Sequence, residues 1–585
     1  MTNKLKPPYQ KYQSDVIVDL LQSYEFEYIA INPGASFRGL HDSLINYGEN
    51  NPKMLVCQHE ETAVQIAHGF AKATGKPMAC ILHDLVGLLH GQMAVYYAFT
   101  DRAPVFILGA TGPMDESKRR PRSDWHHTAQ SQGDAVRNFT KFDYQPHSIE
   151  GVPDSFMRAY SAMVTEPAGP IYLCYDAMLQ EKPLTVELPP IRADIQKTPS
   201  PMAADPITLE NIVRTLLYAK RPWIMAEFSG RQPGNFDKLV TLVETLGVAV
   251  WDVNSALCFP NRHPQALSMD TESLAKADAI LALDVVDWEK ATAKLDSTTR
   301  ELTTYLSNDC TWMEVGFHET GISSWSLDYG RYLPKTLSAL GDPRLVMPQM
   351  TKIAQRLIFA DPALGKKISA RKTKISARHD LIFATWAEEA KVDRDASPLT
   401  PARLAEEVWD IVKDEDWVLS SGTLRQWTRK LWDFDKPYRH PGKGLGTSTQ
   451  IGISLGVALA HKKSDKVVVA IQPDGDLMYD AGALWTAAKH DIPLLIVMFN
   501  NRAYYNDWHH QMRMARSRGT DEGKAHIGMD LFDPEPDFAT IAKGMGMWAE
   551  GPIDRPGDVA AALRRALEVV KSGKPALVDI ITRHR

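Results

Sequence analysis

Residues 467–501 read VVVAIQPDGDLMYDAGALWTAAKHDIPLLIVMFNN, and the fold class can be predicted from the pattern of these residues. Residues 467–472 form a β-branched run that ends in a Pro-Asp-Gly turn, residues 481–489 have a helical composition, and residues 494–499 are a second apolar run. A strand, a crossover helix and a second strand form a right-handed unit with both strands in one parallel sheet. The sequence therefore predicts an α/β protein with parallel sheets.

Two polar residues, Asp474 and Asn501, follow the two predicted strands. Because the carboxyl ends of parallel strands meet at one edge of the sheet, we expect these side chains to lie close together. A carboxylate oxygen, an amide oxygen and a loop carbonyl near Ala503 are hard ligands that suit Mg²⁺, which usually completes its octahedron with phosphate oxygens. The sequence therefore predicts a Mg²⁺ site here. The alternative is an ordinary nucleotide-like α/β crossover with a polar turn.

Length and composition exclude several classes of partner. A chain of 585 residues predicts three or four domains of about 150 residues each, and a net charge of −6 gives no electrostatic case for nucleic acid. The five cysteines are widely spaced and form no CxxC pair, so neither a zinc site nor a disulfide framework is indicated. No apolar run reaches the ~20 residues that cross a bilayer, and the N-terminus lacks the apolar core of a signal peptide. We expect a cytoplasmic protein without a membrane or nucleic-acid partner.

The motif in residues 467–501 resembles the metal-diphosphate motif of thiamine diphosphate enzymes, Gly-Asp-Gly followed by Asn-Asn, with Pro473 in place of the first glycine. The ALWTAA segment is most similar to benzoylformate decarboxylase, and the resemblance extends over nearly the whole chain. It implies three doubly wound parallel-sheet domains. These are a pyrimidine-binding domain (1–190), a middle domain (205–345) and a diphosphate-binding domain (396–585), with a linker at 346–395.

The same resemblance implies four catalytic residues. Glu60 opens a helix in the segment HEETAVQIAHGFAKATGKP, at the position of the family glutamate that contacts the aminopyrimidine ring of the cofactor. His83 in ILHDLVG and His263 in CFPNRHP match the two active-site histidines of benzoylformate decarboxylase, and His127 matches a paired-histidine motif of pyruvate decarboxylases. Each assignment has an alternative: a helix-start acid for Glu60, loop or turn histidines for the others, and Gln130 or Gln132 in place of His127.

Several residues are candidates for binding the cofactor. The small side chains at 420–423 expose backbone N–H groups that suit diphosphate oxygens, and Gly446 follows in family order. Ser448 aligns with the bulky apolar residue that bends the cofactor in the family, with Leu445 and Ile451 as neighbours. The complete set of expected cofactor contacts is Gly422, Thr423, Leu424, Gly446, Ser448, Asp474, Gly475, Asp476, Asn501 and Tyr504.

Other features depart from the family or stay open. The turn that carries a serine after glycine in benzoylformate decarboxylase reads Asn-Pro-Gly-Ala here, which displaces the serine to Ser36. Residues 502–510 are more polar than a pocket for an aromatic ring should be. The middle domain of some family members binds FAD or a nucleotide, but residues 205–345 contain no glycine-rich fingerprint for either.

The resemblance implies a thiamine diphosphate- and Mg²⁺-dependent enzyme that cleaves or forms a C–C bond of a 2-keto acid without oxidation. Three alternatives remain open: a thiamine-dependent hydrolase of a 1,2-diketone, a carboligase similar to acetolactate synthase, and a non-catalytic cofactor-binding scaffold, against which Glu60 argues. In the family Glu60 and Asp474 come from different subunits, which implies a homodimer or homotetramer.

Overall fold

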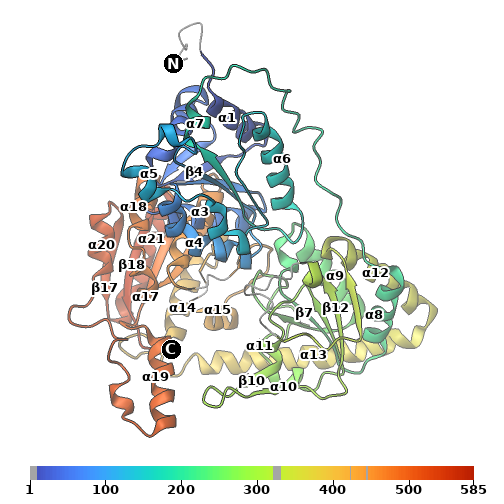
Figure 1. The fold of residues 1–585 in the computed structure, drawn as a ribbon. Coiled ribbons are helices and arrows are strands. Elements are labelled where there is room, and N and C mark those ends of the chain that lie inside the picture. The colour runs from blue at the N-terminus through green and yellow to red at the C-terminus, as the bar shows by residue number, and fades with distance from the viewer. Residues whose placement is uncertain (1–9, 321–330, 422, 443–445, 585) are drawn as a thin grey trace. The chain divides into compact units, whose positions relative to one another are not determined.

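The computed structural model describes residues 10–320, 331–421, 423–442 and 446–584. These residues contain three parallel sheets, one within each predicted domain range, so the predicted α/β class is confirmed. The chain divides into two compact units, Met1–Ser200 with Leu455–Ala460, and Pro201–Ser454 with His461–Arg585. The first unit carries the first sheet, and the second unit carries the other two (Figure 1).

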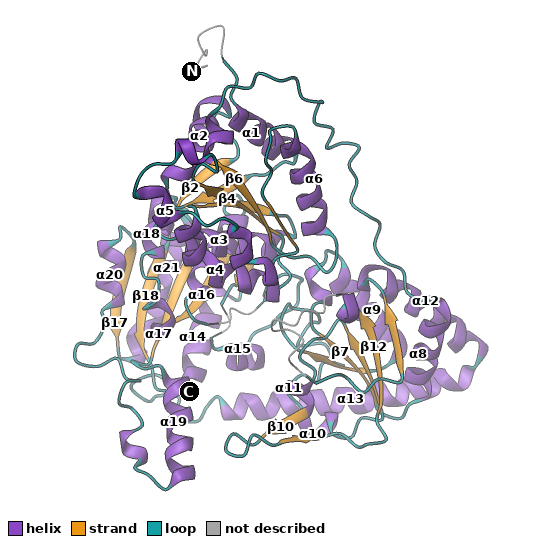
Figure 2. Ribbon diagram, viewed as in Figure 1, coloured by secondary structure: helices purple, strands orange, loops and turns teal. Residues whose placement is uncertain are grey.

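The first sheet has six strands in the order β2-β1-β3-β4-β6-β5, all parallel. Figure 2 shows helices on both of its faces. Its strands are β1 (Tyr28–Ile31), β2 (Lys53–Val56), β3 (Met78–Leu82), β4 (Val105–Thr111), β5 (Phe142–Tyr144) and β6 (Ile171–Asp176). Its α-helices are α1 (Gln13–Ser23), α2 (Arg38–Asp42), α3 (Glu60–Thr74), α4 (Leu85–Thr100), α5 (Ser123–His127), α6 (Gly151–Val164) and α7 (Ala177–Glu181).

The middle sheet has five parallel strands in the order β13-β12-β9-β7-β8. Its strands are β7 (Pro222–Ala226), β8 (Ala249–Asp252), β9 (Ala279–Leu283), β12 (Thr311–Gly316) and β13 (Leu337–Leu340), and β10 (Ala293–Leu295) pairs antiparallel with β11 (Leu302–Thr304) beside them. The α-helices are α8 (Pro206–Tyr218), α9 (Asn235–Leu246), α10 (Thr271–Leu274), α11 (Glu289–Thr292), α12 (Pro343–Ala360) and α13 (Pro362–Glu389).

The expected linker at 346–395 is helical and packs on the middle domain. Val346 and Ile368, from α12 and α13, lie in the same apolar core as the middle sheet. The buried Arg371 guanidinium donates hydrogen bonds to the carbonyls of Leu216 and Leu246. These carbonyls end α8 and α9 and have no partner inside their helices, so the arginine satisfies them. The basic composition of this segment therefore marks a docked helix and not a free connector.

The third sheet has the order β14-β15-β16-β18-β17, again all parallel. The strands are β14 (Trp417–Leu419), β15 (Val467–Pro473), β16 (Leu495–Asn500), β17 (Trp548–Ile553) and β18 (Ala576–Ile581). The α-helices are α14 (Pro401–Val412), α15 (Arg425–Leu431), α16 (Thr449–His461), α17 (Asp474–Leu477), α18 (Ala483–Lys489), α19 (Tyr505–Arg518), α20 (Phe538–Gly544) and α21 (Pro556–Lys571). The β15–α18–β16 unit has the order predicted from residues 467–501. Among the described residues, no helix is long and apolar enough to cross a membrane.

Candidate functional site

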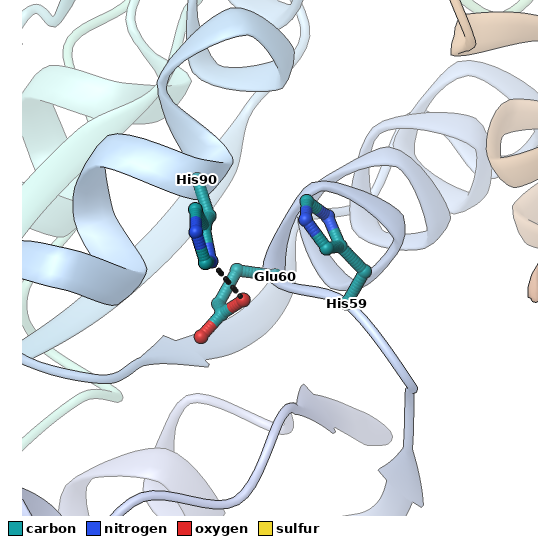
Figure 3. A group of neighbouring side chains, drawn as sticks. All are labelled: His59, Glu60 and His90. Carbon is teal, nitrogen blue, oxygen red and sulfur yellow. Dashed lines mark hydrogen bonds and ion pairs between the residues drawn. The ribbon is translucent and has the colours of Figure 1, made fainter. Parts of the chain in front are cut away.

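Glu60 is the first residue of α3, directly after the loop that leaves β2. Its carboxylate is almost fully buried, and its Oε2 lies 3.2 Å from His90 Nδ1 of α4 (Figure 3). His59 caps α3 because its Nδ1 accepts a hydrogen bond from the Glu61 backbone at 3.2 Å. The rings of His59 and His90 stack with centroids 5.1 Å apart. Burial and the contact with His90 give Glu60 a defined position at the start of the helix.

The His59, Glu60 and His90 side chains also offer one possible metal-ligand atom each, and these three atoms lie within 4.8 Å of one another. Tetrahedral zinc with bonds of ~2.1 Å needs neighbouring ligand atoms about 3.4 Å apart. The His59 Nδ1 lone pair is already used by the helix cap. We therefore interpret the two histidines as the polar surroundings of Glu60 and not as a metal centre.

His83 follows β3 and sits beside Glu60 in the first unit. A methyl group at Gly87 would lie 2.8 Å from His83 Cβ and 2.9 Å from Glu60 Oε1, so only glycine allows these two side chains to approach. The His127 ring of α5 lies 5.6 Å from the His83 ring. The structure therefore brings together three of the four expected catalytic residues.

Gln132, the alternative to His127, belongs to the core. Its amide nitrogen donates to the Ala110 carbonyl at 2.9 Å, and lies 3.1 Å from the Tyr172 hydroxyl. The side chain is buried, so it is committed to holding the loop against the first sheet. His127 is half-buried and its Nδ1 lies 2.7 Å from the Ser123 carbonyl, which orients the ring within α5.

The expected metal ligands meet at the carboxyl edge of the third sheet. Strands β15 and β16 pair with Pro473 opposite Phe499, so Asp474 and Asn501 leave the same edge. The Ala503 backbone N–H donates both to Asp474 Oδ2 at 3.2 Å and to Asn501 Oδ1 at 3.1 Å. One hydrogen reaches both oxygens, so they converge as a Mg²⁺ site requires. Burial raises the pKa of Asp474 to about 6, a cost that a bound cation would relieve.

Tyr504 packs on the loop that carries Asp474. A methyl group at Gly475 would lie 2.7 Å from the Tyr504 ring, so the ring covers this glycine directly. The Tyr504 backbone N–H donates to the Met529 carbonyl at 2.7 Å. The next residue begins α19, in which no described side chain is buried. Exposure to solvent therefore accounts for the polarity of residues 505–510.

The segment before α16 has an unusual backbone. Gly446, Thr447 and Ser448 have φ values of 82°, 53° and 76°, a left-handed region that costs non-glycine residues about 1–3 kcal/mol each and clusters at functional sites. The Ser448 hydroxyl is buried and has no hydrogen-bond partner among the described residues. A buried hydroxyl without a partner beside the Asp474 loop fits a ligand rich in acceptor oxygens, such as a diphosphate.

The other expected cofactor contacts differ in character. Thr423 Oγ1 donates to Gln450 Oε1 at 2.9 Å, whereas the Leu424 side chain lies in the apolar core and offers only its backbone. Ile451 is fully buried in α16. Gly422 and Leu445 lie outside the described residues.

His263 has a separate environment in the middle domain. Its Nδ1 accepts a hydrogen bond from the Gln265 backbone at 3.1 Å, and its Nε2 lies 3.4 Å from Glu244 Oε1 of α9. Phe259 packs edge-on against the ring. These contacts hold the ring in a turn of the middle domain, and a catalytic role for His263 stays a prediction.

Carboxylates line the carboxyl edge of the middle sheet. Glu227 after β7 accepts hydrogen bonds from the backbones of Val286 and Asp287 at 2.6 and 3.1 Å. Asp252 at the end of β8 accepts one from the Asn254 backbone at 2.7 Å. In nucleotide-binding sheets such N–H groups bind phosphate, but here they are used by buried acids.

Comparison with known proteins agrees with this geometry. Residues 13–137 match the family described as thiamine pyrophosphate enzyme, N-terminal TPP binding domain, and residues 420–580 match the thiamine pyrophosphate enzyme, C-terminal TPP binding domain. The chain contains the N-terminal and the C-terminal TPP-binding domains of the thiamine pyrophosphate enzymes. The first match contains Glu60, His83 and His127, and the second contains Asp474 and Asn501.

Relatives and solved structures extend this similarity over nearly the whole enzyme. It is 22% identical to the probable acetolactate synthase large subunit of Methanocaldococcus jannaschii, over 97% of this chain and 91% of the relative. It is 24% identical to the acetolactate synthase isozyme 3 large subunit of Escherichia coli, over 94% and 91%. The benzoylformate decarboxylase from Polynucleobacter necessarius has a similar fold, with a TM-score of 0.75 and 18% identity over 98% of this chain and 99% of that one. The 4-hydroxybenzoylformate decarboxylase of Rhodococcus jostii gives 0.74 and 18% over the same shares.

Sequence reasoning missed three residues of the first-unit site: Asp84, Gly87 and His90. Asp84 directly follows His83, and a pair of adjacent titratable residues at a strand end is a signal that could have been used. Gly87 and His90 fall three and six residues further on in α4. Their importance depends on the crossing of α3 and α4, which the sequence pattern does not specify.

Proposed function

We propose that the enzyme uses thiamine diphosphate and Mg²⁺ to cleave or form a C–C bond beside the carbonyl of a 2-keto acid, without oxidation. The convergence of Asp474 and Asn501 on one backbone N–H, inside the matched C-terminal TPP-binding domain, carries this proposal. These two oxygens would hold Mg²⁺, and the strained residues 446–448 would receive the diphosphate. When bound, thiamine diphosphate supplies a nucleophilic carbon and an electron sink for the bond that breaks.

The first unit supplies the proton chemistry in this proposal. Glu60 presents a buried carboxyl group to the aminopyrimidine ring, the role that the family resemblance gives it. His83 and His127 lie side by side and can move protons to and from the reacting oxygen and carbon atoms, since imidazole changes charge near neutral pH. Gly87 keeps His83 and Glu60 close enough to serve one substrate.

We further propose a homodimer or homotetramer, because Glu60 lies in the first unit and Asp474 in the second, and the family resemblance places the two in different subunits. Sedimentation of the cofactor-loaded protein tests this, and an active monomer would contradict it. At the middle sheet we propose that no nucleotide diphosphate binds, because the N–H groups at its edge already serve Glu227 and Asp252. Calorimetric titration with FAD and with ADP tests that proposal, and saturable binding of either compound would contradict it.

The central experiment measures CO₂ release from small aliphatic and aromatic 2-keto acids by the cofactor-loaded enzyme. Glu60→Gln should keep cofactor binding and lose turnover by about 10²–10⁴-fold, the usual contribution of a positioned acid or base. Glu61→Gln is the matched control, because Glu61 follows directly in α3 and its carboxylate accepts a hydrogen bond from Gln65 of the same helix. Release that depends on Glu60 supports the proposal. No release from any acid, with cleavage of a 1,2-diketone instead, would replace it by the hydrolase reading.

A further inference from the structure

Asp84 occupies the N-cap position of α4, but its side chain makes no capping hydrogen bond. It is the residue before α4, a position where a carboxylate usually accepts the backbone N–H of the second or third helical residue. No such cap bond forms, the side chain is fully buried, and neither carboxylate oxygen accepts a hydrogen bond from the described residues. A buried polar group that forgoes its local partners requires an explanation, and such exceptions concentrate at functional sites.

The carboxyl group is turned toward His83. Its Oδ1 lies 3.4 Å from His83 Nε2. On the other side of the ring, Ser36 Oγ lies 2.8 Å from His83 Nδ1 and accepts a hydrogen bond from the Asp84 backbone at 3.2 Å. Ser36 Oγ has a second lone pair that can accept from the Nδ1–H of a neutral imidazole, and in that tautomer the Nε2 lone pair faces the Asp84 carboxyl group. Ser36 and Asp84 therefore lie at the two nitrogens of one imidazole ring, with a hydrogen-bond distance to the serine and a 3.4 Å contact to the carboxyl group.

Burial gives both groups an unusual protonation. It raises the pKa of Asp84 to about 7, while His127 and Arg120 oppose this rise and Asp124 adds to it. It lowers the pKa of His83, helped by His127 and Arg120 and opposed by Glu60. Tyr172 and Cys174 of β6 face Asp84 from the sheet, and burial raises the pKa of each, so they stay neutral. Burial thus favours the uncharged form of both neighbours.

We propose that Asp84 is the positioning residue that holds a proton in common with His83, so that the pair and not the histidine alone sets the ionisation of this part of the active site. The role of His83 in turnover rests on the proposed function, but the shared proton does not. In the transfer, the O–H bond of the Asp84 carboxylic acid breaks as an N–H bond forms at His83 Nε2, so that a neutral acid and a neutral imidazole become a carboxylate and an imidazolium. The reverse step restores the starting state.

Stability against pH tests the protonation of Asp84 without any assay of activity. A carboxyl group whose pKa is raised by folding favours the folded state less as it ionises, so its contribution is lost between its unfolded pKa of about 4 and pH 7. Asp84→Asn, which cannot ionise, should match the natural protein below pH 4 and unfold at a higher temperature above pH 7. Asp205→Asn is the control, since Asp205 is a helix-capping aspartate with a lowered pKa and should show the opposite sign.

The pH profile of kcat tests the coupling to His83. Two groups that share a proton give two apparent ionisations, and a bell-shaped profile reports both. Asp84→Asn should remove one limb of the bell, the acid or the basic one according to which partner carries the proton in the active enzyme. Asp84→Ser, which is smaller and also neutral, should remove the same limb. An unchanged bell in both variants, or a stability difference that does not vary with pH, would overturn the proposal. If the natural enzyme shows no turnover, the proposed function is refuted. The pH dependence of the stability of Asp84→Asn then tests the protonation of Asp84 by itself.

Discussion

Asp476 Oδ1 accepts a hydrogen bond from the backbone N–H of Ser448 at 2.8 Å, which ties the turn after β15 to the start of α16. Its second oxygen accepts from Gln450 N at 3.3 Å and from the Gln472 amide at 3.0 Å. The carboxylate therefore caps a helix whose first residues approach the expected diphosphate position. This geometry gives Asp476 an indirect influence on the cofactor position, and a direct contact with the cofactor stays a prediction.

We expect Asp476→Ala to lower the free energy of unfolding by at least about 1–2 kcal/mol, because a helix cap is lost and the backbone of Ser448 loses its partner. Cofactor affinity should fall in the same variant as residues 446–448 relax. Urea unfolding and calorimetric titration measure the two effects. Asp465→Ala, an exposed position just before β15, is the control. Weaker cofactor binding with unchanged stability would show that Asp476 contacts the cofactor directly.

Gly87→Ala should reduce turnover at least tenfold with little loss of stability. The added methyl group would lie within 3 Å of both Glu60 Oε1 and His83 Cβ, so one of these side chains must move. The higher helix propensity of alanine, worth about 0.5–1 kcal/mol, offsets part of the strain. Steady-state kinetics and thermal unfolding measure both effects. Gly365→Ala in α13, where a methyl group meets nothing within 4 Å, should leave turnover unchanged.

Removal of the metal should release the cofactor. Asp474→Ala deletes one of the two oxygens that converge on Ala503 N, so Mg²⁺-dependent cofactor affinity should fall at least a hundredfold, roughly 3 kcal/mol. EDTA should have the same effect on the natural enzyme, and Mg²⁺ should reverse it. Asp491→Ala, which removes only an exposed partner of Lys574, serves as the control in calorimetry. Cofactor affinity that survives both treatments would refute the metal assignment.

Asp101 should dominate the stability of the helix pair that carries Glu60 and His90. It is buried against Lys72 and lies 3.0 Å from His68 Nε2, so it joins α3 to the end of α4. Despite its burial, Lys72 and His68 hold the pKa of this carboxyl well below its usual range. Because folding lowers the pKa, the contribution to stability is present above pH 4 and is lost as the pH falls below it.

Asp101→Asn should therefore cost about 3–5 kcal/mol at pH 7, since it leaves the Lys72 ammonium buried without a countercharge. The cost should shrink at pH 3, where the natural carboxyl starts to be protonated on unfolding. Urea unfolding at both values measures it. Asp154→Asn, which breaks an exposed pair with Arg158, should change stability by less than about 0.5 kcal/mol. Equal costs for the two variants at pH 7 would contradict this account.

The parallel-sheet architecture, the cofactor family and the meeting of Asp474 and Asn501 at one sheet edge could all be predicted from the sequence. Each depends on local order: β-branched runs alternate with helical segments, and Asp474 and Asn501 follow successive strands, whose parallel pairing brings them to one edge. The approach of His83 and His127 to Glu60 was predicted only through resemblance, because these residues come from separate segments of the first domain.

The hydrogen-bond partners of the other polar residues depend on the folded arrangement of distant segments. Asp476 accepts from the backbone at the start of α16, Gln132 donates to the Ala110 carbonyl, and His263 accepts from the Gln265 backbone. Asp84 gained its position from three elements that meet: the end of β3, the start of α4 and the Ser36 turn. Hydrogen-bond partners and burial depend on contacts between distant segments, and a residue's type and spacing do not contain that information. Residues 366–380 have the basic composition of a solvated linker. In the structure they belong to helix α13, which Arg371 joins to the ends of α8 and α9.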